Sequence, residues 1–550
     1  MMKKIFLYIT IFITVLFISS CNNKTPKNQT TTKIDRAESF FGDKTAAEWK
    51  EYYKDIIDID RDKNGVPDWQ EVEMTIVYAS DFYDDEDELN TLFRNALKWA
   101  EKYPNITVVR DQRFKKATTN DSDDVLLELL TAASQDGSMP DIYYSPRSAE
   151  VYDQDLTLDL TPYLRTDEEA RYISSNAFEF MTSFDGQEIW GLPYMSVSLF
   201  AVVNRGLLKE KNIPIPSYDW TYEEYETMRA KVGLMTDSGQ CIFPGIINFS
   251  EIGPHYFDGI PNGWKGFNIK TQRFDFTNAV NYGAWLTEEA AEGDRGWHFW
   301  DLETSQREAI CGSYGNPWAD GFQAVESTWF YMLSTNVQDW ILTRGLDIDV
   351  YPLPQAPAGG VTATQGFYDT FSLSYKLKDD PVKAQAVFEL AKWLTYGEEG
   401  TKARWSLIEE DIQKYGYSVD EWIEKGNSPD TFPTVHPSTH LMDYIMGWPV
   451  TTNPEVLKNH PLVKGFPEDS PFAVYNFPAF KTEEFQRQLS NPVAYPRQIP
   501  AAAKAMEDLN IWDDIKNRIK NEGYSYQTIA PEIDDLLNQR MDDFLRNYTK

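Results

Sequence analysis

Short β-rich runs alternate with amphipathic helices along the chain. Residues 74–79 (Met-Thr-Ile-Val-Tyr-Ala) and 106–109 (Ile-Thr-Val-Val) have the composition of strands. Between them, apolar side chains recur at offsets 0, 3, 4, 7, 8 and 11 from Leu89, which is the spacing of one helix face. Pro104 ends this helix, because proline cannot continue the helical hydrogen bonds. Strand, helix and strand in this order predict a βαβ unit.

The alternation continues further along the chain. Residues 125–133 have a helical pattern, Gly137 and Pro140 interrupt it, and residues 141–144 have the pattern of a short buried strand. Alternating helices and strands predict an α/β fold, in which helices cover open sheets. Ligands of such sheets bind beyond the carboxyl ends of the strands. The polar residues that directly follow these strands, and are expected near a ligand, are Ser80, Asp81, Ser145 and Arg147.

The N-terminus has the pattern of an export signal. Lys3 and Lys4 precede an apolar run over residues 5–18, which is too short for a comfortable membrane span. The small residues before Cys21 resemble the lipobox of bacterial lipoproteins, which implies cleavage after residue 20 and lipidation of Cys21. The alternative is a signal peptide that happens to end near a cysteine. The polar residues 22–33 cannot bury enough surface to fold, so we expect a tether.

Composition and charge narrow the possible partners. The 550 residues have a formal net charge of -34, and the basic residues are scattered, so nucleic acid is not expected to bind. The negative charge is expected to keep an exported body soluble and monomeric. No other stretch of eighteen apolar residues follows the signal. The sequence leaves open whether Cys241 and Cys311 form a disulfide.

Residues 60–71 match the spacing of an EF-hand calcium loop. The pattern D-x-[DN]-x-[DN]-G is followed by five residues and a glutamate, and such loops surround calcium with oxygen ligands. Pro67 argues against the usual flanking helix, so a structural clip is expected rather than a sensor. An acidic turn without metal is the alternative. The expected ligands are the side chains of Asp60, Asp62, Asn64, Asp68 and Glu71 and the carbonyl of Val66.

Several motifs, in their order and spacing, resemble the extracellular solute-binding proteins of family 1, which include the maltose-binding protein. The resemblance covers about residues 74–405. The motifs are P-D-I at Pro140, G-x-x-x-W-G-L-P-Y at Gly186, an apolar strand at 196–203, N-R-x-L-L at Asn204, W-T-x-E-E at Trp220, a tryptophan-bearing segment at 321–332 taken as a helix, and a capped helix that begins at Asp380-Pro381.

This resemblance implies two α/β lobes with a ligand cleft between them, and additional C-terminal helices. Residues 533–547 have the spacing of a docked amphipathic helix. The expected division is a signal peptide (1–20), the lipidated cysteine with its tether (21–50), the calcium loop segment (51–73), a first lobe (74–192 and 360–405) and a second lobe (195–349 and 406–550).

Aromatic side chains suit a carbohydrate ligand, because sugars present apolar ring faces rimmed by hydroxyls. Tryptophans beside glycine or proline are favoured as platforms over Trp285 or Trp393, although packing in the core is the alternative for each. Tyr194 and the pair Tyr368-Asp369 are expected where the chain crosses between lobes. The complete set of expected ligand residues is Asp81, Tyr143, Tyr144, Arg147, Tyr194, Trp264, Trp318, Trp329, Tyr368 and Asp369.

The residues do not match any common catalytic motif. The sequence has no G-x-S-x-G, H-E-x-x-H or Walker motif and only five histidines, so neither catalysis nor a catalytic cofactor is expected. The resemblance implies capture of a carbohydrate outside the cytoplasm and its delivery to the permease of an ABC importer by a protein anchored in the membrane through lipid. Capture of an oligopeptide is the alternative.

Overall fold

The computed structural model describes most of the chain beyond the N-terminal 39 residues. The described residues are 40–79, 91–114, 122–145, 151–152, 154–183, 188–232, 253–261, 266–293, 303–305, 308, 318, 321, 323–433, 435–494, 500–506 and 509–546. Cys21, Asp81, Arg147, Cys241, Trp264 and Cys311 lie outside these residues.

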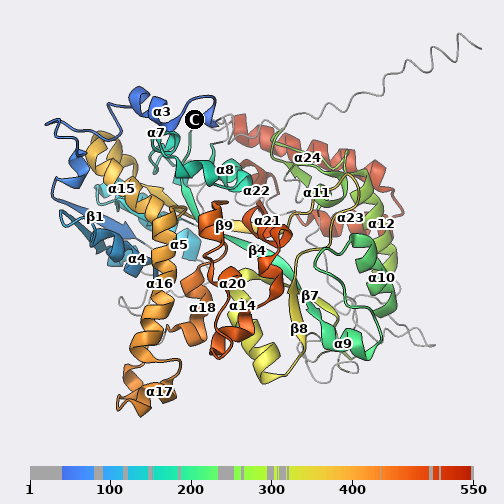
Figure 1. Ribbon diagram of the computed structural model, residues 1–550. Coiled ribbons are helices and arrows are strands. Elements are labelled where there is room, and N and C mark those ends of the chain that lie inside the picture. The colour runs from blue at the N-terminus through green and yellow to red at the C-terminus, as the bar shows by residue number, and fades with distance from the viewer. Residues whose placement is uncertain are drawn as a thin grey trace, which may run out of the picture.

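An eight-stranded mixed sheet runs through the middle of the molecule (Figure 1). Its main path has the order β2-β1-β3-β9-β4-β7, with β10 paired to β9 and β8 paired to β4. The strands are β1 (Met74–Ala79), β2 (Ile106–Arg110), β3 (Ile142–Tyr144), β4 (Leu192–Asn204), β7 (Val325–Trp329), β8 (Ile348–Tyr351), β9 (Gln365–Leu373) and β10 (Val493–Ala494). A separate hairpin joins β5 (Phe267–Asn268) to β6 (Arg273–Phe274).

The α-helices surround this sheet (Figure 1). In the first half of the chain they are α3 (Ala46–Tyr52), α4 (Thr91–Ala100), α5 (Ser122–Asp136), α7 (Thr161–Thr166), α8 (Ser175–Met181), α9 (Arg205–Glu210), α10 (Tyr222–Val232) and α11 (Pro254–Asp258). They continue with α12 (Val280–Gly293), α14 (Leu333–Val337), α15 (Pro381–Leu394), α16 (Glu398–Tyr415), α17 (Val419–Glu424), α18 (Pro437–Ile445), α19 (Pro454–Leu457), α20 (Pro461–Lys464), α21 (Glu483–Ser490), α22 (Pro500–Met506), α23 (Ile511–Lys520) and α24 (Tyr526–Arg546).

The predicted βαβ unit is present. Strand β1 is parallel to β2 and to β3, and α4 connects β1 to β2. Strand β3 is antiparallel to β9, which returns to this part of the sheet from far along the chain. The predicted α/β fold is therefore confirmed.

Strand β4 joins the two halves of the sheet. All thirteen of its residues are buried. Residues 192–198 pair with β9, whereas residues 199–204 pair with β7 and β8. A second connection runs beside β4: the backbone groups of Ser196 and Trp448 exchange two hydrogen bonds of 2.8 and 3.1 Å. We call residues 446–451 the crossing segment.

Three clusters of buried apolar side chains hold the halves together. Core 1 contains side chains of β1, β3, α4 and α15. Core 2 contains Ala201 and Val203 of β4, whereas core 3 contains Phe200 and Val202, because neighbouring side chains of a strand point to opposite faces. The crossing segment reaches two cores, with Met446 in core 1 and Trp448 in core 3.

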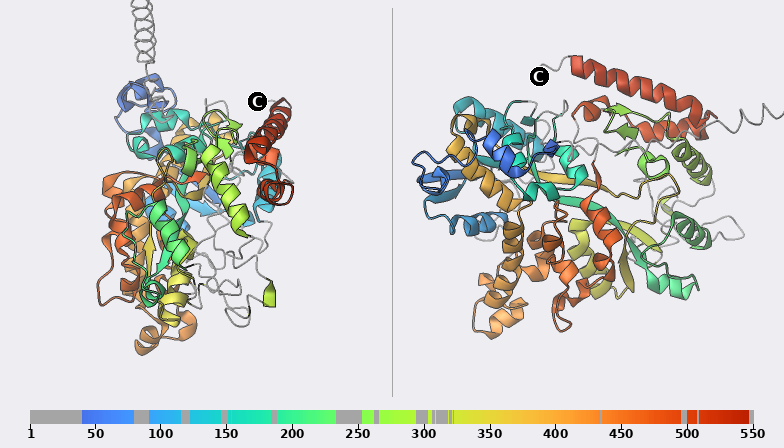
Figure 2. Two further views of the ribbon diagram at one scale, coloured as in Figure 1. Left: turned by 90° about the vertical axis from the view of Figure 1, so that its right-hand side faces the viewer. Right: turned by 45° about the horizontal axis from the view of Figure 1, so that its top comes forward.

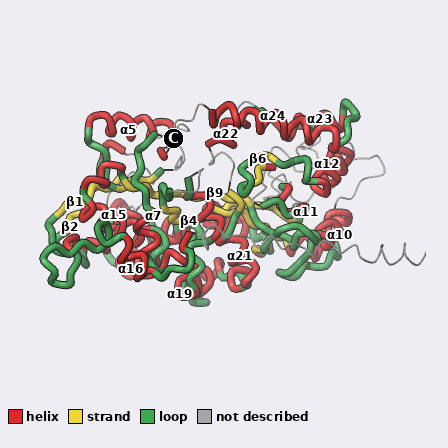
Figure 3. The backbone as a smooth tube through the Cα atoms, turned by 90° about the horizontal axis from the view of Figure 1, so that it is seen from above, coloured by secondary structure: helices red, strands yellow, loops and turns green. Residues whose placement is uncertain are grey.

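The C-terminal helix is longer than predicted but lies as expected. Ile533, Leu537 and Met541 of α24 are buried in core 2. The carboxylate of Asp534 accepts hydrogen bonds from the backbone N–H groups of Phe276 (2.7 Å) and Thr277 (2.8 Å). Figures 2 and 3 show α24 beside α22 and α23 on the outside of the molecule. The amphipathic pattern thus predicted a docked helix correctly.

One predicted element is wrong. Residues 321–332 were expected to form a tryptophan-bearing helix, but Val325–Trp329 form strand β7, which pairs antiparallel with β4. The run Val-Glu-Ser-Thr-Trp is poor in helix formers, and pairing along the buried strand β4 supplies its backbone hydrogen bonds. A short 3₁₀ turn (Phe330–Met332) and α14 follow. Across the described part of the chain, no helix is both long and apolar enough to cross a membrane.

Candidate functional site

One face of the sheet gathers side chains where its two halves meet. Across from β4, Asp369 pairs with Met195, Phe367 with Val197, and Trp329 with Leu199. Directly opposed residues in an antiparallel pair project to the same face. A register shift between Pro193 and Met195 introduces a bulge at this point, which turns the strand. We call the face that carries Met195, Val197, Leu199, Trp329, Phe367 and Asp369 the junction face.

Two aromatic rings of the junction face remain partly accessible. The ring centroids of Trp329 and Phe367 are 5.4 Å apart, with an angle of 55° between the planes. Both rings are partly buried and lie against the edge of core 1. Partly exposed neighbouring rings offer an apolar surface of the kind that stacks on a sugar face.

A buried carboxylate lies beside these rings. Asp369 is 4% exposed and accepts a hydrogen bond of 2.9 Å from the hydroxyl of Tyr144. The ring of Tyr144 packs edge-on against Tyr194 at 6.2 Å, and Tyr194 packs against Phe371 at 5.2 Å. Tyr144 therefore holds the carboxylate of Asp369 in place, and Tyr194 packs against the ring of Tyr144. Asp369, Tyr144 and Tyr194, three of the predicted residues, are thus brought together.

Tyr143 and Tyr368 lie elsewhere. Tyr143 is fully buried, and its hydroxyl donates to the carbonyl of Leu156 at 2.9 Å. Tyr368 is fully buried, packs on Phe180 and donates to the carbonyl of Pro492 at 3.3 Å. Tyr143 directly precedes Tyr144 in β3, and Tyr368 directly precedes Asp369 in β9. Neighbouring side chains of a strand point to opposite faces, so both tyrosines point away from the junction face. Their contacts therefore favour packing in the core over the ligand contact that was predicted for both.

Trp318 requires a correction. It was favoured as a ligand platform because it follows Gly315 and Pro317, but its side chain is 0% exposed and belongs to core 3. Its ring packs edge-on against Trp340, with centroids 5.2 Å apart. A neighbouring glycine and proline allow a close backbone approach without deciding which way the ring points. The structure therefore assigns Trp318 to the core.

Sequence reasoning missed Phe367. The residues selected were its neighbours Tyr368 and Asp369, although two successive strand residues cannot face the same ligand. The alternation within β9 was a usable signal: once Asp369 is placed on the ligand face, Phe367 must share it. Met195 and Val197 follow from the same alternation in β4. Nothing in the sequence by itself marked where β7 would pair.

The predicted calcium loop is folded as a compact turn. The backbone N–H of Gly65, a residue with φ of +88°, donates to a carboxylate oxygen of Asp60 at 2.8 Å. The side-chain amide of Asn64 donates to Glu71 at 2.9 Å and to Asp62 at 3.3 Å. Four predicted ligands thus converge.

The fifth predicted side chain, Asp68, bonds to a different residue of the loop. Asp68 accepts a hydrogen bond of 3.0 Å from the backbone of Arg61, whose guanidinium lies 3.4 Å from it. The Asn64 amide, placed among the carboxylates, keeps them apart. Within the described ranges, no three His, Cys, Asp or Glu side chains are grouped to hold a metal ion. The donor set suits calcium in chemistry, and calcium binding stays a prediction.

The loop packs against α4 and the turn before β2. Trp69, its tenth residue, is 4% exposed and stacks on Trp99 of α4, with centroids 6.3 Å apart and planes at 8°. The side-chain amide of Asn105 donates to the carbonyls of Trp69 at 3.0 Å and Val72 at 2.9 Å. The loop therefore joins the N-terminal segment to core 1.

Comparison with known proteins shows what this fold is similar to. No family model matches the sequence, and no curated protein matches it in sequence. A sugar transporter of Rhizobium etli, solved in an open conformation, aligns with 84% of this chain and 99% of its own at 13% identity and a TM-score of 0.52. A family 1 extracellular solute-binding protein of Bifidobacterium longum subsp. infantis aligns with 86% of this chain and 100% of its own, at 13% identity and a TM-score of 0.50.

A third solved structure agrees with these two. The cyclic α-maltosyl-1,6-maltose binding protein of Arthrobacter globiformis aligns with 86% of this chain and 99% of its own, at 13% identity and a TM-score of 0.50. The likeness extends over nearly the whole of each of these proteins. The chain therefore has the two-lobed fold of extracellular solute-binding proteins, as its motifs predicted.

Proposed function

We propose that this protein captures a carbohydrate outside the cytoplasm and delivers it to the permease of an ABC importer. The observation that carries the proposal is the pair of partly exposed rings, Trp329 and Phe367, beside the buried carboxylate of Asp369. Rings stack on the apolar faces of a sugar, and a carboxylate accepts hydrogen bonds from its hydroxyls.

The position of Trp329, Phe367 and Asp369 in the sheet supports a binding role. The junction face lies where β4 passes from one half of the sheet to the other, so a ligand bound there would contact both halves. Ligands that bind between two lobes favour the closed arrangement, which a permease could distinguish from the open one. The solute-binding fold supplies the precedent for such a role.

Binding of intact sugar is the direct test. The full-length protein, purified in detergent, is titrated calorimetrically with neutral oligosaccharides, acidic oligosaccharides and peptides. Heat of binding with a neutral or acidic oligosaccharide, recovered unchanged afterwards, would support the proposal. Binding of peptides alone would favour the oligopeptide alternative, and cleaved sugar would point to an enzyme.

The anchor and the permease belong to the same proposal. The lipobox resemblance at Cys21 implies a lipid on that residue and a tether that holds the folded body near the membrane. Mass spectrometry of the mature N-terminus would show the added acyl chains, and the Cys21→Ala variant would lack them. Release of that variant into the medium would support anchoring through Cys21.

Calcium binding by residues 60–71 is proposed as a structural clip. The side chains of Asp60, Asp62, Asn64, Asp68 and Glu71 and the carbonyl of Val66 would supply oxygen ligands, which calcium prefers. Binding there would fasten the N-terminal segment to core 1 through Trp69.

A further inference from the structure

Arg404 of α16 is a buried guanidinium to which no described residue supplies a counter-charge. Its side chain is 1% exposed, and its Nε and Nη1 groups find no hydrogen-bond partner among the residues that the structure describes. Two partly buried arginines differ: Arg94 forms two hydrogen bonds of 2.7 and 2.8 Å with Asp411, and Arg229 lies 2.6 Å from Glu289. No carboxylate in the described part of the chain forms an ion pair with Arg404.

The groups that surround Arg404 cannot neutralise it. Its electrostatic neighbours are the phenol of Tyr194, on β4, and the imidazole of His460. Burial, with a smaller effect from Arg404, lowers the pKa of His460 to about 3, so this imidazole is uncharged at neutral pH. Its Nδ1 accepts a hydrogen bond of 3.3 Å from the backbone N–H of Leu462, and the backbone of Gly447 lies against the imidazole. The ring centroids of Trp405 and Trp448 lie 5.0 and 4.4 Å from that of the imidazole, so aromatic rings surround it.

The charge itself persists at neutral pH. Burial lowers the pKa of Arg404 to about 10, which still leaves the guanidinium protonated at pH 7. An isolated buried charge costs several kcal/mol unless it is paired and hydrogen-bonded. A water molecule would accept the free N–H groups but would leave the charge uncompensated. A small anion would accept the free N–H groups and also compensate the charge, since the guanidinium fork presents several donors to one acceptor.

We propose that Arg404, through its Nε–H and Nη1–H groups, forms an internal site for a small inorganic anion such as chloride. The site lies where β4 and the crossing segment meet, because Tyr194 is on β4 and Gly447 of the crossing segment faces His460. The bound anion stabilises the junction between the two halves of the sheet without touching the sugar.

Halide dependence of thermal stability tests the site. The full-length protein in detergent is unfolded in sodium gluconate, with chloride or bromide substituted at constant ionic strength. We expect the melting temperature to rise by roughly 2 °C or more as chloride reaches about 200 mM. The variant Arg404→Met, which removes the charge and keeps an unbranched side chain, should not respond to halide. Arg344→Met, at an arginine paired on the surface with Asp339, should respond like the wild type.

The location of the anion is tested separately. Crystals of the wild-type protein grown in sodium bromide should show an anomalous peak within hydrogen-bonding distance of Arg404 Nε or Nη1, which requires no variant to fold. A wild-type melting temperature that is indifferent to halide, together with only water at this position, would overturn the proposal. An equal halide response in Arg404→Met would overturn it as well.

Discussion

The rings of Trp329 and Phe367 meet across β4, although one residue belongs to β7 and the other to β9. Strand β4 lies between those two strands, so a ligand that stacks on both rings contacts both halves of the sheet at once. A change in the angle between the halves would therefore separate or join the two rings. This arrangement makes ring contact sensitive to lobe closure.

Replacement of Trp329 by alanine should weaken sugar binding about tenfold or more, since a stacked aromatic contributes about 0.5–1.5 kcal/mol beyond the area it buries. The folded state should lose little stability, because the ring is only partly buried. Calorimetric titration with the best oligosaccharide measures the change. Trp422→Ala is the matched control, since α17 lies at the far end of α16 (Figure 1). Equal affinities of the two variants would exclude Trp329 from the site.

Replacement of Trp318 by alanine should have the opposite profile. The ring is fully buried against Trp340, so its loss leaves a cavity in core 3 and should cost about 3–5 kcal/mol of unfolding free energy. Sugar affinity of the fraction that remains folded should be unchanged. Denaturant unfolding and calorimetric titration of the same preparation separate the two effects. A stable variant that fails to bind sugar would return Trp318 to the ligand site.

The sequence predicted the helices and strands better than the orientation of side chains or the pairing of strands. The strand at 74–79 and the helix that begins at Pro381 were predicted because alternation and capping are local: the side chain of Asp380 accepts from the backbone of Lys383, as a helix cap should. The orientation of Trp318 and the pairing of β7 depend on contacts between residues far apart in the chain. Neither turn residues nor periodicity carries that information.

The calcium clip predicts a stability effect without a binding effect. Addition of calcium should raise the melting temperature, whereas the double variant Asp60→Asn with Asp62→Asn should lose this response, because it removes two anionic ligands. Sugar affinity should be unchanged, since the loop packs on α4 through Trp69 rather than on the junction face. Fluorescence of the stacked pair Trp69 and Trp99 offers a local readout. Lost sugar affinity at unchanged stability would contradict the clip.

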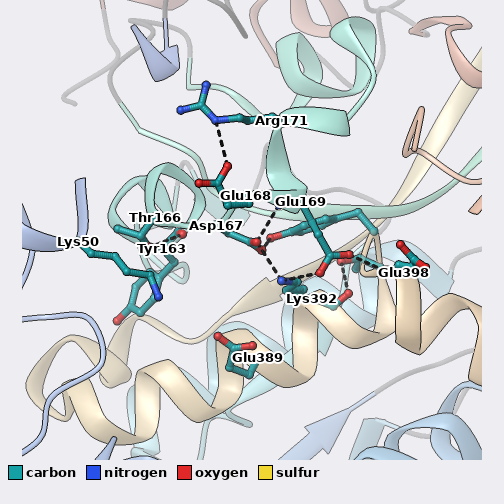
Figure 4. Close-up of polar contacts among 12 residues, drawn as sticks. Lys50, Tyr163, Thr166, Asp167, Glu168, Glu169, Arg171, Glu389, Lys392 and Glu398 are labelled. Atoms are coloured by element: carbon teal, nitrogen blue, oxygen red, sulfur yellow. Dashed lines mark hydrogen bonds and ion pairs between the residues drawn. The ribbon is translucent and has the colours of Figure 1, made fainter. Parts of the chain in front are cut away.

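Glu389 of α15 should make the fold less stable as pH rises. Burial raises the pKa of this carboxyl to about 7, and the nearby ammonium of Lys392 offsets only part of the effect. Lys392 is itself held by Asp167 at 2.9 Å and Glu169 at 2.8 Å (Figure 4). Glu389 accepts a hydrogen bond of 2.9 Å from the amide of Gln385, which does not require a charge.

Proton linkage determines how the free energy of unfolding changes with pH. Between about pH 4.5 and pH 7 the folded protein holds a proton on Glu389 that the unfolded chain has lost, so the free energy of unfolding falls as pH rises through this window. The variant Glu389→Gln should be as stable as the wild type near pH 4 and more stable near pH 8, by an amount on the order of 3 kcal/mol. Glu468→Gln, at an exposed position, is the control that should track the wild type at every pH. Denaturant unfolding from pH 4 to pH 8 measures the difference, in which the other titrating groups cancel. A constant difference across this range would show that folding does not raise the pKa of Glu389.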